Sequence, residues 1–448
     1  MSNNRRHRRG PRLPEQTFEA CIESLSDEGR GIAHVDGRPV FIDQALPGER
    51  VLFKYSRLKS KVAEGRAVEI IESSVDRIKP PCRVFEVCGG CSLQHMHGRA
   101  QLEMKQRGLL KQLASIAKIE PDVVIEPLAG PELAYRNKAR LSVRYVDKKA
   151  RTLIGFRERA SSYITDTERC EILHPRVGPL LGELAGCISR LQLRNQIPQI
   201  EVAVGDEQAV LVFRHLEELP QSDKDRLADF AQQHVLTIML QPGKPDALVP
   251  LWPVQPEPLF YRVDEFDVRI EFEPSDFTQI NCVINRRMVS AAVDYLELTE
   301  TDRVLDLFSG LGNFTLPISR RCEHVVGVEG SLLMVQKARQ NATINHIDNA
   351  EFHFADLYSD EVADTLWVKK CYNKILLDPP RSGAAGILGY IGRMKAAKIV
   401  YVSCHPATLA RDAGVLVNDM GYGLVRAGVM DMFPHTAHVE SIAVFEKR

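Results

Sequence analysis

The sequence predicts a multidomain protein that begins with a small OB-like β-barrel and ends in a doubly wound α/β domain. From residue 276 onward, apolar strand-like runs alternate with helix-like segments, the pattern of a parallel sheet covered by helices on both faces. Residues 15–72 instead form five short strand-like runs separated by Gly, Asp and Pro turns, which favours a small barrel. A chain of 448 residues is also too long for one ordinary core.

These patterns divide the chain into four parts. They are a basic disordered arm over 1–14, the barrel over 15–74, a central mixed α/β domain over 75–275 and a C-terminal domain over 276–448. The five arginines of the arm suit a solvated tail, and such arms also bind phosphates. Helical spacing over 97–119 predicts a helix, which packs either within the central domain or on the C-terminal domain.

Composition narrows the class of protein. The net charge is -1 and 44% of the residues are hydrophobic, as expected for a globular protein. The sequence has no apolar run long enough to span a bilayer and no apolar leader, so we expect a cytoplasmic protein. In that compartment its ten cysteines should be thiols or metal ligands rather than disulfides.

A glycine-rich loop follows the first strand of the C-terminal domain. Gly310 and Gly312 let the backbone pass close to a ligand before the next helix begins. Three successive strands end in an acid: Asp306, Glu329 and Asp356. The loop lacks the dinucleotide spacing, so a nucleoside cofactor without a pyrophosphate fits better, with S-adenosylmethionine (SAM) as the leading candidate. The alternative is an ordinary βα turn with a capping acid. Acids at the ends of three successive strands make that alternative less favoured.

The next strand ends in Asp378-Pro379-Pro380-Arg381. Two prolines stiffen this loop, and an acid held there can orient a base edge or tune a nearby thiol. SAM enzymes that methylate exocyclic amines usually place an aromatic residue after the prolines. Arg381 takes that place here, which argues against amine methylation.

A further strand delivers Cys404 to a loop that contains a proline, which is how an α/β enzyme presents a nucleophile. A thiolate that adds to C6 of uracil would make C5 able to take a methyl group. A base must then remove the C5 proton. The segment before the last strand offers Glu440, His435 and His438; we favour Glu440, although a solvated acid at a strand edge would look the same.

Three cysteines lie at metal-ligand spacing in one loop: Cys82, Cys88 and Cys91. Cys170 is the best candidate for a fourth ligand. Four thiolates suit either Zn²⁺ or an iron–sulfur cluster, and the spacing alone does not choose between them.

Taken together, these motifs resemble the bacterial RNA (uracil-5-)-methyltransferases over nearly the whole chain, and among them the type that modifies uracil 1939 of 23S ribosomal RNA. The resemblance implies that residues 15–72 form a TRAM barrel and that the C-terminal domain is a SAM-dependent methyltransferase domain. It makes Cys404 the nucleophile, Glu440 the general base and Asp378 the orienting acid. It also implies a set of cofactor-site residues: Gln279, Phe308, Gly310, Asn313, Glu329, Asp356 and Asp378.

The resemblance further implies that Cys82, Cys88, Cys91 and Cys170 hold a [4Fe-4S] cluster rather than zinc. The resemblance also implies that the protein binds 23S ribosomal RNA, that it binds neither a membrane nor DNA, and that it is a monomer. One departure is His405, where the family pattern leads us to expect Asn.

Two rival functions stay open on the sequence. A cytosine-C5 RNA methyltransferase would usually carry a second cysteine at the position of Pro380. An RNA-binding ribosome-assembly protein with a relic methyltransferase domain is the other rival, and the intact Cys404, Asp378 and Glu440 argue against it.

Overall fold

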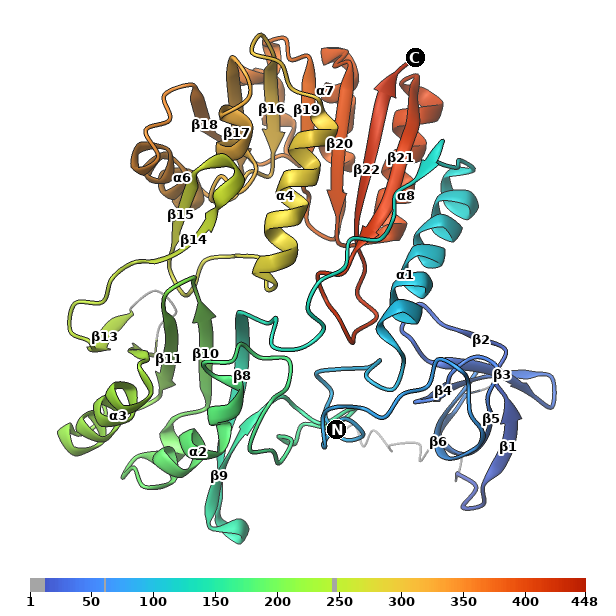
Figure 1. Ribbon diagram of the computed structural model, residues 1–448, viewed down its shortest axis with the longest axis vertical. Coiled ribbons are helices and arrows are strands. Elements are labelled where there is room, and N and C mark those ends of the chain that lie inside the picture. Colours follow the sequence, from blue (N-terminus) through green and yellow to red (C-terminus); the bar gives the residue numbers. More distant parts are fainter. Residues whose placement is uncertain (1–12, 60–61, 244–247) are drawn as a thin grey trace, which may run out of the picture. The chain divides into compact units, whose positions relative to one another are not determined.

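The computed structural model describes residues 13–59, 62–243 and 248–448, and the chain forms two compact units (Figure 1). The barrel unit consists of residues Met1–Glu86, Cys91–Gln101 and His435–Ala437. The sheet unit consists of Val87–Gly90, Leu102–Pro434 and His438–Arg448. The predicted basic arm lies outside the described residues except for its last two positions, so its predicted disorder stays a prediction.

The barrel unit is a six-stranded sheet, one strand more than the sequence predicted. Its strands are β1 Phe18–Cys21, β2 Ser24–Leu25, β3 Gly31–Val35, β4 Arg38–Asp43, β5 Arg50–Leu58 and β6 Ala63–Glu72, in the spatial order β1-β5-β6-β4-β3-β2. The two-residue β2 is too short to show any alternation of apolar and polar positions. Val40, Ile42, Val51 and Phe53 alternate along their strands and close a small apolar core.

The sheet unit contains two separate large sheets. The first, the central sheet, has the order β13-β12-β11-β10-β8-β9. Its strands are β8 Lys138–Val146, β9 Arg151–Gly155, β10 Gln199–Val204, β11 Ala209–His215, β12 Thr237–Pro242 and β13 Val249–Trp252. Helices α2 Leu181–Ser189 and α3 Gln221–His234 complete its core through residues such as Leu184, Ile188 and Leu227.

The second, the catalytic sheet, has eight strands in the order β18-β17-β16-β19-β20-β22-β21-β7 (Figure 1). Its strands are β7 Val123–Val124, β16 Arg303–Leu307, β17 His324–Glu329, β18 Ala350–Phe354, β19 Lys374–Leu377, β20 Lys398–Ser403, β21 Tyr422–Met430 and β22 Glu440–Lys447. The strands from β18 to β20 pair in parallel, whereas β22 is antiparallel to both β20 and β21.

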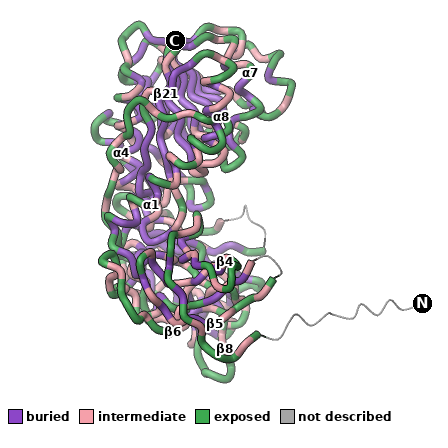
Figure 2. The backbone as a smooth tube through the Cα atoms, turned by 90° about the vertical axis from the view of Figure 1, so that its right-hand side faces the viewer, coloured by how far each residue is buried: buried purple, intermediate pink, exposed green. Residues whose placement is uncertain are grey.

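Alternate residues of the inner catalytic strands, such as β16, β17, β19 and β20, enter two different cores, which confirms the doubly wound prediction. Val304 packs with helices α4 Cys282–Leu296, α5 Thr315–Ser319 and α6 Leu332–Ile344 and with the hairpin β14 Leu259–Val263 and β15 Val268–Phe272. The next residue, Leu305, packs with α7 Ala385–Met394 and α8 Pro406–Gly414. Figure 1 shows α4 in front of the sheet, and Figure 2 shows the buried residues concentrated along the strands.

The helix expected over 97–119 is α1 Gly98–Gln112, which continues as a π-helical turn over Leu113–Ala117. Leu109 and Leu113 are buried in the same core as Leu305, so this end of the helix covers the catalytic sheet. In the described residues no helix is both long and apolar enough to cross a membrane. The ten cysteines, all within the described residues, form no disulfide.

Candidate active site

The register of the parallel strands brings the predicted site residues into one row. Leu377 pairs with Leu307 on one side and with Tyr401 on the other, and Leu307 pairs with Val328. The residues that follow these strands therefore leave the sheet at the same edge. In spatial order they are Glu329, Phe308, Asp378 and Cys404.

Glu440 joins this row from the opposite direction. Ser403 pairs with Ser441 across β20 and β22, and the Ser441 hydroxyl donates to the Ser403 carbonyl at 3.0 Å. Because the two strands are antiparallel, the residue after Ser403 lies beside the residue before Ser441. Those residues are Cys404 and Glu440, so the predicted nucleophile and base are neighbours.

The turn that carries Cys404 is held by the start of helix α8. His405 is the N-cap, with Nδ1 accepting from the Thr408 N–H at 3.4 Å, and Pro406 supplies the fixed backbone angle that suits the first helical position. The Ser403 hydroxyl also accepts from the His405 N–H at 3.1 Å. Asn is a favoured N-cap, and the imidazole nitrogen of His405 does the same task, so this departure from the family pattern leaves the turn intact.

The thiol of Cys404 is half-buried and surrounded by acids. Burial raises its pKa to about 11, the charges of Glu440 and Asp378 add to the rise, and Arg381 opposes it. The free protein therefore holds Cys404 as a thiol at neutral pH. A thiolate forms more easily when the neighbouring acids are neutral and Arg381 stays close.

The acids of the row carry raised pKa values of their own. Burial raises the pKa of Asp378 to about 7, with a contribution from Asp306. Burial also raises the pKa of Asp306 to about 7, against a hydrogen bond donated by Thr315. The pKa of Glu440 lies well above its usual value because of burial and the nearby Asp378. A carboxyl group whose pKa is raised in this way can serve as a proton donor or acceptor in a reaction near neutral pH.

The glycine-rich loop has an open position and unfilled polar atoms. Gly310 has φ +54°, and a Cβ there would meet no atom within 4 Å. Its N–H donates to the Glu329 carboxylate at 3.1 Å, which fixes the loop to the end of β17. The buried atoms Asp306 Oδ1 and Ser309 Oγ have no hydrogen-bond partner among the residues that the structure describes. Open space beside unpaired acceptors and donors fits a nucleoside cofactor such as SAM.

The other predicted cofactor residues differ in how available their side chains are. Phe308 has φ +69° and lies 6.0 Å from the ring of Tyr358, while Gln279 is half-buried. Asp356 is exposed and accepts from the Tyr358 N–H at 3.0 Å.

Asn313 is committed to the protein itself. Its side-chain amide exchanges two 3.0 Å hydrogen bonds with that of Asn285 and accepts a third, at 2.9 Å, from the Tyr261 hydroxyl. Asn313 therefore braces the loop through its side chain. The sequence prediction missed Tyr261 and Asn285, which stand 52 and 28 residues away and carry no local signal.

The two histidines considered as alternative bases differ in their surroundings. Burial and the charges of Arg381, Lys105 and Arg136 lower the pKa of His438, so it is neutral at neutral pH. His435 belongs to the barrel unit, where its Nδ1 lies 3.2 Å from the side-chain amide nitrogen of Gln101. The segment before β22 is also tied down by a buried ion pair, with Lys105 Nζ 2.7 Å from Asp431.

The four candidate cluster cysteines are divided between the units. Cys82 and Cys91 belong to the barrel unit, and Cys88 and Cys170 to the sheet unit. Across the described part of the chain, no group of three or more His, Cys, Asp or Glu residues is arranged to hold a metal ion. The sulfur of Cys88 accepts from the Gly90 N–H at 3.4 Å, the kind of backbone donor that tunes a thiolate ligand.

Comparison with known proteins decides the family. The profile of the tRNA (uracil-5-)-methyltransferase family matches residues 97–448, and the TRAM domain profile matches residues 11–68. The chain belongs to the tRNA (uracil-5-)-methyltransferase family. These matches confirm the predicted barrel and methyltransferase domain, whereas the iron–sulfur assignment of the central domain stays a prediction.

Relatives within the family align over almost their whole length. A 23S rRNA (uracil(1939)-C(5))-methyltransferase of Methylococcus capsulatus is 51% identical, covering 97% of this chain and 98% of its own. The protein of the same name from Alcanivorax borkumensis is 49% identical, covering 98% and 99%. A solved structure, the Pyrococcus abyssi tRNA (uracil-54, C5)-methyltransferase with S-adenosyl-L-homocysteine, is 25% identical with a TM-score of 0.71, covering 96% of this chain and 100% of that one.

Proposed function

We propose that this protein is a SAM-dependent methyltransferase that acts on C5 of a uracil in 23S ribosomal RNA, with uracil 1939 as the target. The adjacency of Cys404 and Glu440 at the edge of the catalytic sheet carries the proposal. The full-length relatives that are about half identical bear this activity in their names. A protein of the same family has been solved with S-adenosyl-L-homocysteine, the demethylated form of SAM.

Cys404 acts as the nucleophile. Its sulfur loses a proton to water and bonds to C6 of the uracil, while the C5–C6 π electrons move onto O4. SAM, when bound, supplies the methyl group that C5 then takes. Gly310, Glu329 and the buried acceptor of Asp306 are suited to hold SAM at this edge, because the Glu329 carboxylate fixes the open glycine loop and Asp306 Oδ1 has no hydrogen-bond partner among the described residues.

Glu440 acts as the general base. It removes the proton that C5 still carries, the electrons of that C–H bond restore the C5–C6 double bond, and the C6–S bond breaks to release Cys404. The raised pKa of Glu440 makes its carboxylate a stronger base than an exposed glutamate. Asp378, at the end of β19, lies on the other side of Cys404 from Glu440 and orients the base edge, since its carboxyl can donate or accept near neutral pH.

The single most direct test of these roles is the Glu440→Gln variant. Without a base, Cys404 still adds to C6 and C5 still takes the methyl group, and then the reaction stalls. Methylated RNA should therefore remain covalently attached to the protein in denaturing electrophoresis. The double variant Glu440→Gln/Cys404→Ala should show no adduct. Normal turnover by Glu440→Gln would reject this role, and His438 would be the next base to test.

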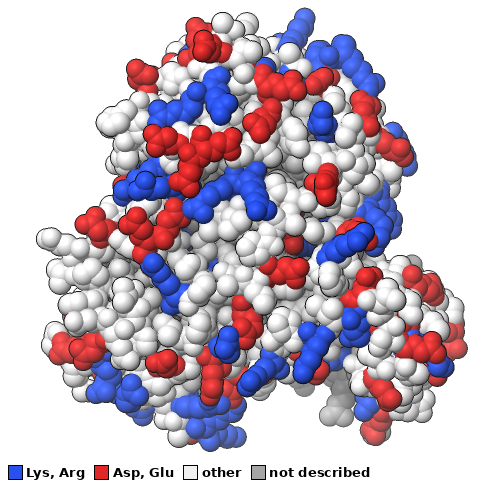
Figure 3. Space-filling view, viewed as in Figure 1, with Lys and Arg blue, Asp and Glu red and all other residues white. Residues whose placement is uncertain are grey.

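RNA recognition is proposed to involve the TRAM barrel as well as the catalytic domain. Lys, Arg, Asp and Glu side chains are interspersed on the face shown in Figure 3, so no single-sign field marks an RNA track there. The target base must leave any stack to reach a thiol at a sheet edge, which a single-stranded RNA loop allows. We further propose a cytoplasmic monomer.

We also propose that Cys82, Cys88, Cys91 and Cys170 bind a [4Fe-4S] cluster. The support is the donor set itself: three cysteines within ten residues, a fourth cysteine at position 170, and a backbone N–H aimed at the Cys88 sulfur. The sheet unit also holds Cys88 firmly, because Arg159 Nε donates to its carbonyl at 3.0 Å and Gly89 N–H donates to Arg157 at 2.8 Å. A structural role suits this set.

Protein purified without oxygen should contain iron and inorganic sulfide and absorb broadly in the visible range. Cys88→Ser should lower the iron content and the folding yield, because metal binding and local folding are coupled. Cys371→Ser, which changes an exposed thiol outside the set, is the matched control and should keep the full iron content. Stoichiometric zinc in colourless protein would contradict the assignment.

A further inference from the structure

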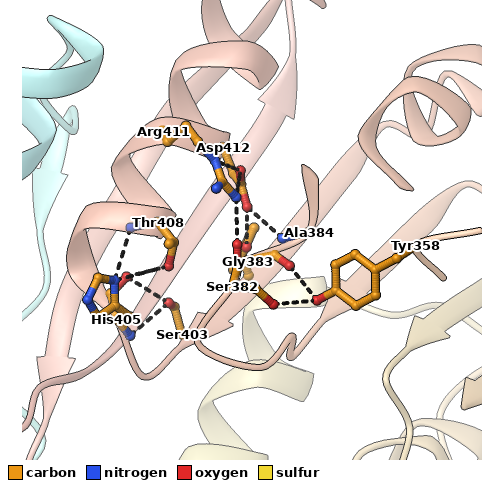
Figure 4. Close-up of polar contacts among 10 residues, drawn as sticks. Tyr358, Ser382, Gly383, Ala384, Ser403, His405, Thr408, Arg411 and Asp412 are labelled. Carbon is orange, nitrogen blue, oxygen red and sulfur yellow. Dashed lines mark hydrogen bonds and ion pairs between the residues drawn. The ribbon is translucent and has the colours of Figure 1, made fainter. Parts of the chain in front are cut away.

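One carboxylate joins the loop that carries Arg381 to the helix that follows Cys404. Asp412 lies on α8 and is fully buried. Its Oδ2 accepts from the Ala384 N–H at 2.7 Å and from the Tyr401 hydroxyl at 2.7 Å, and its Oδ1 accepts from Arg411 Nε at 2.8 Å (Figure 4). Three segments of the active site, β20, α8 and the loop after Asp378, therefore meet at one side chain.

Two further contacts close the same loop. Arg411 Nη2 donates to the Ser382 carbonyl at 2.9 Å, and the Tyr358 hydroxyl donates to the Gly383 carbonyl at 2.8 Å from the other side (Figure 4). The Pro380 carbonyl accepts from the Gly383 N–H at 2.8 Å, which forms a tight turn. The loop is thus gripped on both sides at Ser382 and Gly383.

Gly383 shows how tight this grip is. It has φ +80°, and a Cβ there would lie 2.5 Å from both Asp412 Oδ2 and Arg411 Nη2. Only glycine lets the loop approach the carboxylate this closely. Asp378, by contrast, is held by the sheet, since its N–H donates to Leu307 at 3.3 Å. The Asp412 carboxylate, together with Arg411, therefore fixes the position of the second half of the loop, from Arg381 to Ala384.

We infer that Asp412 is a positioning residue for methyl transfer, which keeps Arg381 facing Cys404 by holding the loop against α8. This inference rests on the proposed role of Cys404. Arg381 is the cation that favours the thiolate form of Cys404. If the loop moves away, Arg381 leaves while Asp378 stays on the sheet, and the thiol becomes harder to ionise.

The Asp412→Asn variant tests this inference in the full chain. An amide offers only one acceptor oxygen, so its NH₂ group would face either Arg411 or the Ala384 and Tyr401 donors. The kcat for methyl transfer should fall about 10- to 100-fold, because small misplacements of reacting groups cost this much, while the KM for SAM changes little. Alkylation of Cys404 by iodoacetamide at pH 8, followed by peptide mass mapping, should slow by about threefold or more.

The control is Asp223→Asn in the central sheet region. Asp223 is equally buried and accepts two backbone N–H groups, from Gln192 at 2.9 Å and Leu193 at 3.0 Å. It should lower thermal stability while leaving kcat and Cys404 alkylation unchanged. Native kcat and native alkylation in Asp412→Asn, or equal losses in Asp223→Asn, would overturn the inference.

Two other variants keep the test decisive if Asp412→Asn does not fold. Arg411→Lys keeps the charge but removes the bond to Ser382, so it should show the same two losses to a smaller degree. Gly383→Ala leaves Asp412 chemically unchanged but should show the same losses, because its Cβ would push the loop away from the carboxylate. Wild-type behaviour in both would overturn the inference, whereas methyl transfer by Cys404→Ala would overturn the proposed function beneath it.

Discussion

The buried carboxyl groups of the two large sheets differ in their hydrogen-bond partners and in their pKa values. In the central sheet region, the buried Asp223 has both carboxylate oxygens occupied by backbone N–H groups. At the edge of the catalytic sheet, one carboxylate oxygen of Asp306 has no hydrogen-bond partner in the described part of the chain. Asp378 and Glu440 beside it have raised pKa values.

The thiols follow the same division. Cys187 on α2 is buried, and burial raises its pKa within an apolar core. Cys404 is only half-buried, at the edge of the catalytic sheet, and the charges that act on its pKa are those of the other site residues, Glu440, Asp378 and Arg381. A buried polar group with all its partners stabilises a fold, whereas an under-satisfied one at an accessible edge is poised for chemistry.

The largest expected difference between the sheets comes from removing each thiol. Cys404→Ala should lower methyl transfer by at least about 10³-fold, because C5 is never activated, and should leave SAM binding intact. Cys187→Ala should cost about 1 kcal/mol of stability through a small cavity and leave activity unchanged. A methyl-transfer assay on ribosomal RNA and thermal unfolding measure both. Comparable activity in the two variants would remove the distinction between the sheets.

The pH dependence of the reaction should reflect only the catalytic edge. Below a thiol pKa of about 11, the thiolate fraction of Cys404 grows about tenfold per pH unit. The ionised fraction of Glu440 also grows as pH rises toward its raised pKa. The kcat/KM for RNA should therefore rise from pH 6 to pH 9, and Cys187→Ala should give the same profile. A rate that falls across this range would contradict the assignment of both groups.

The smallest expected effect is on the pH dependence of folding stability. The Asp378 carboxyl has a folded pKa of about 7, above the ordinary value of 3.8, so the unfolded chain ionises first. Its contribution to folding is full below pH 3.8 and is lost as pH rises to about 7. Asp378→Asn removes this loss, so its unfolding midpoint at pH 8 should exceed that of the wild type by roughly 2–4 °C.

The same change in the central sheet should behave differently. Asp223→Asn loses one of two backbone hydrogen bonds and should be less stable by about 1–3 kcal/mol. Thermal unfolding at pH 4.5 and pH 8 separates the two cases. A higher unfolding midpoint for Asp223→Asn at pH 8, or an unchanged midpoint for Asp378→Asn, would show that the two carboxyls are not in different electrostatic environments.

Local sequence pattern predicted much of the catalytic sheet. The strands over 303–307 and 324–329 belong to the alternation of strand-like and helix-like segments predicted from residue 276 onward, because continuous apolar runs between clear turns mark buried parallel strands. Strand β7 was missed, since two exposed valines carry no periodicity, and β21 was missed because glycines interrupt its apolar run. The topology of the central sheet was not predicted, because β8 pairs with β10 across helix α2 and β11 pairs in parallel with β12 across helix α3, and local pattern shows neither pairing.

The site was predicted in its residues but not in its contacts. Cys404, Asp378 and Glu440 could be proposed because each lies at the end of an apolar strand-like run or of a motif beside one. Asp412 was missed, although it sits among Leu409, Ala410 and Ala413 at core spacing on an amphipathic helix. An acid at such a position is the signal that could have found it.

The sequence by itself determined the alternation of strands and helices that predicts the doubly wound domain, the residues delivered to the sheet edge and the family to which the chain belongs. Only the tertiary structure shows that Cys404 lies beside Glu440. It also shows that the Asn313 side chain is hydrogen-bonded to Asn285 and Tyr261, and that Asp412 accepts a hydrogen bond from the loop after Arg381. The reason is physical. Which face a residue takes follows from local periodicity, whereas burial, Coulomb interaction and hydrogen-bond satisfaction depend on distances between residues far apart in the chain.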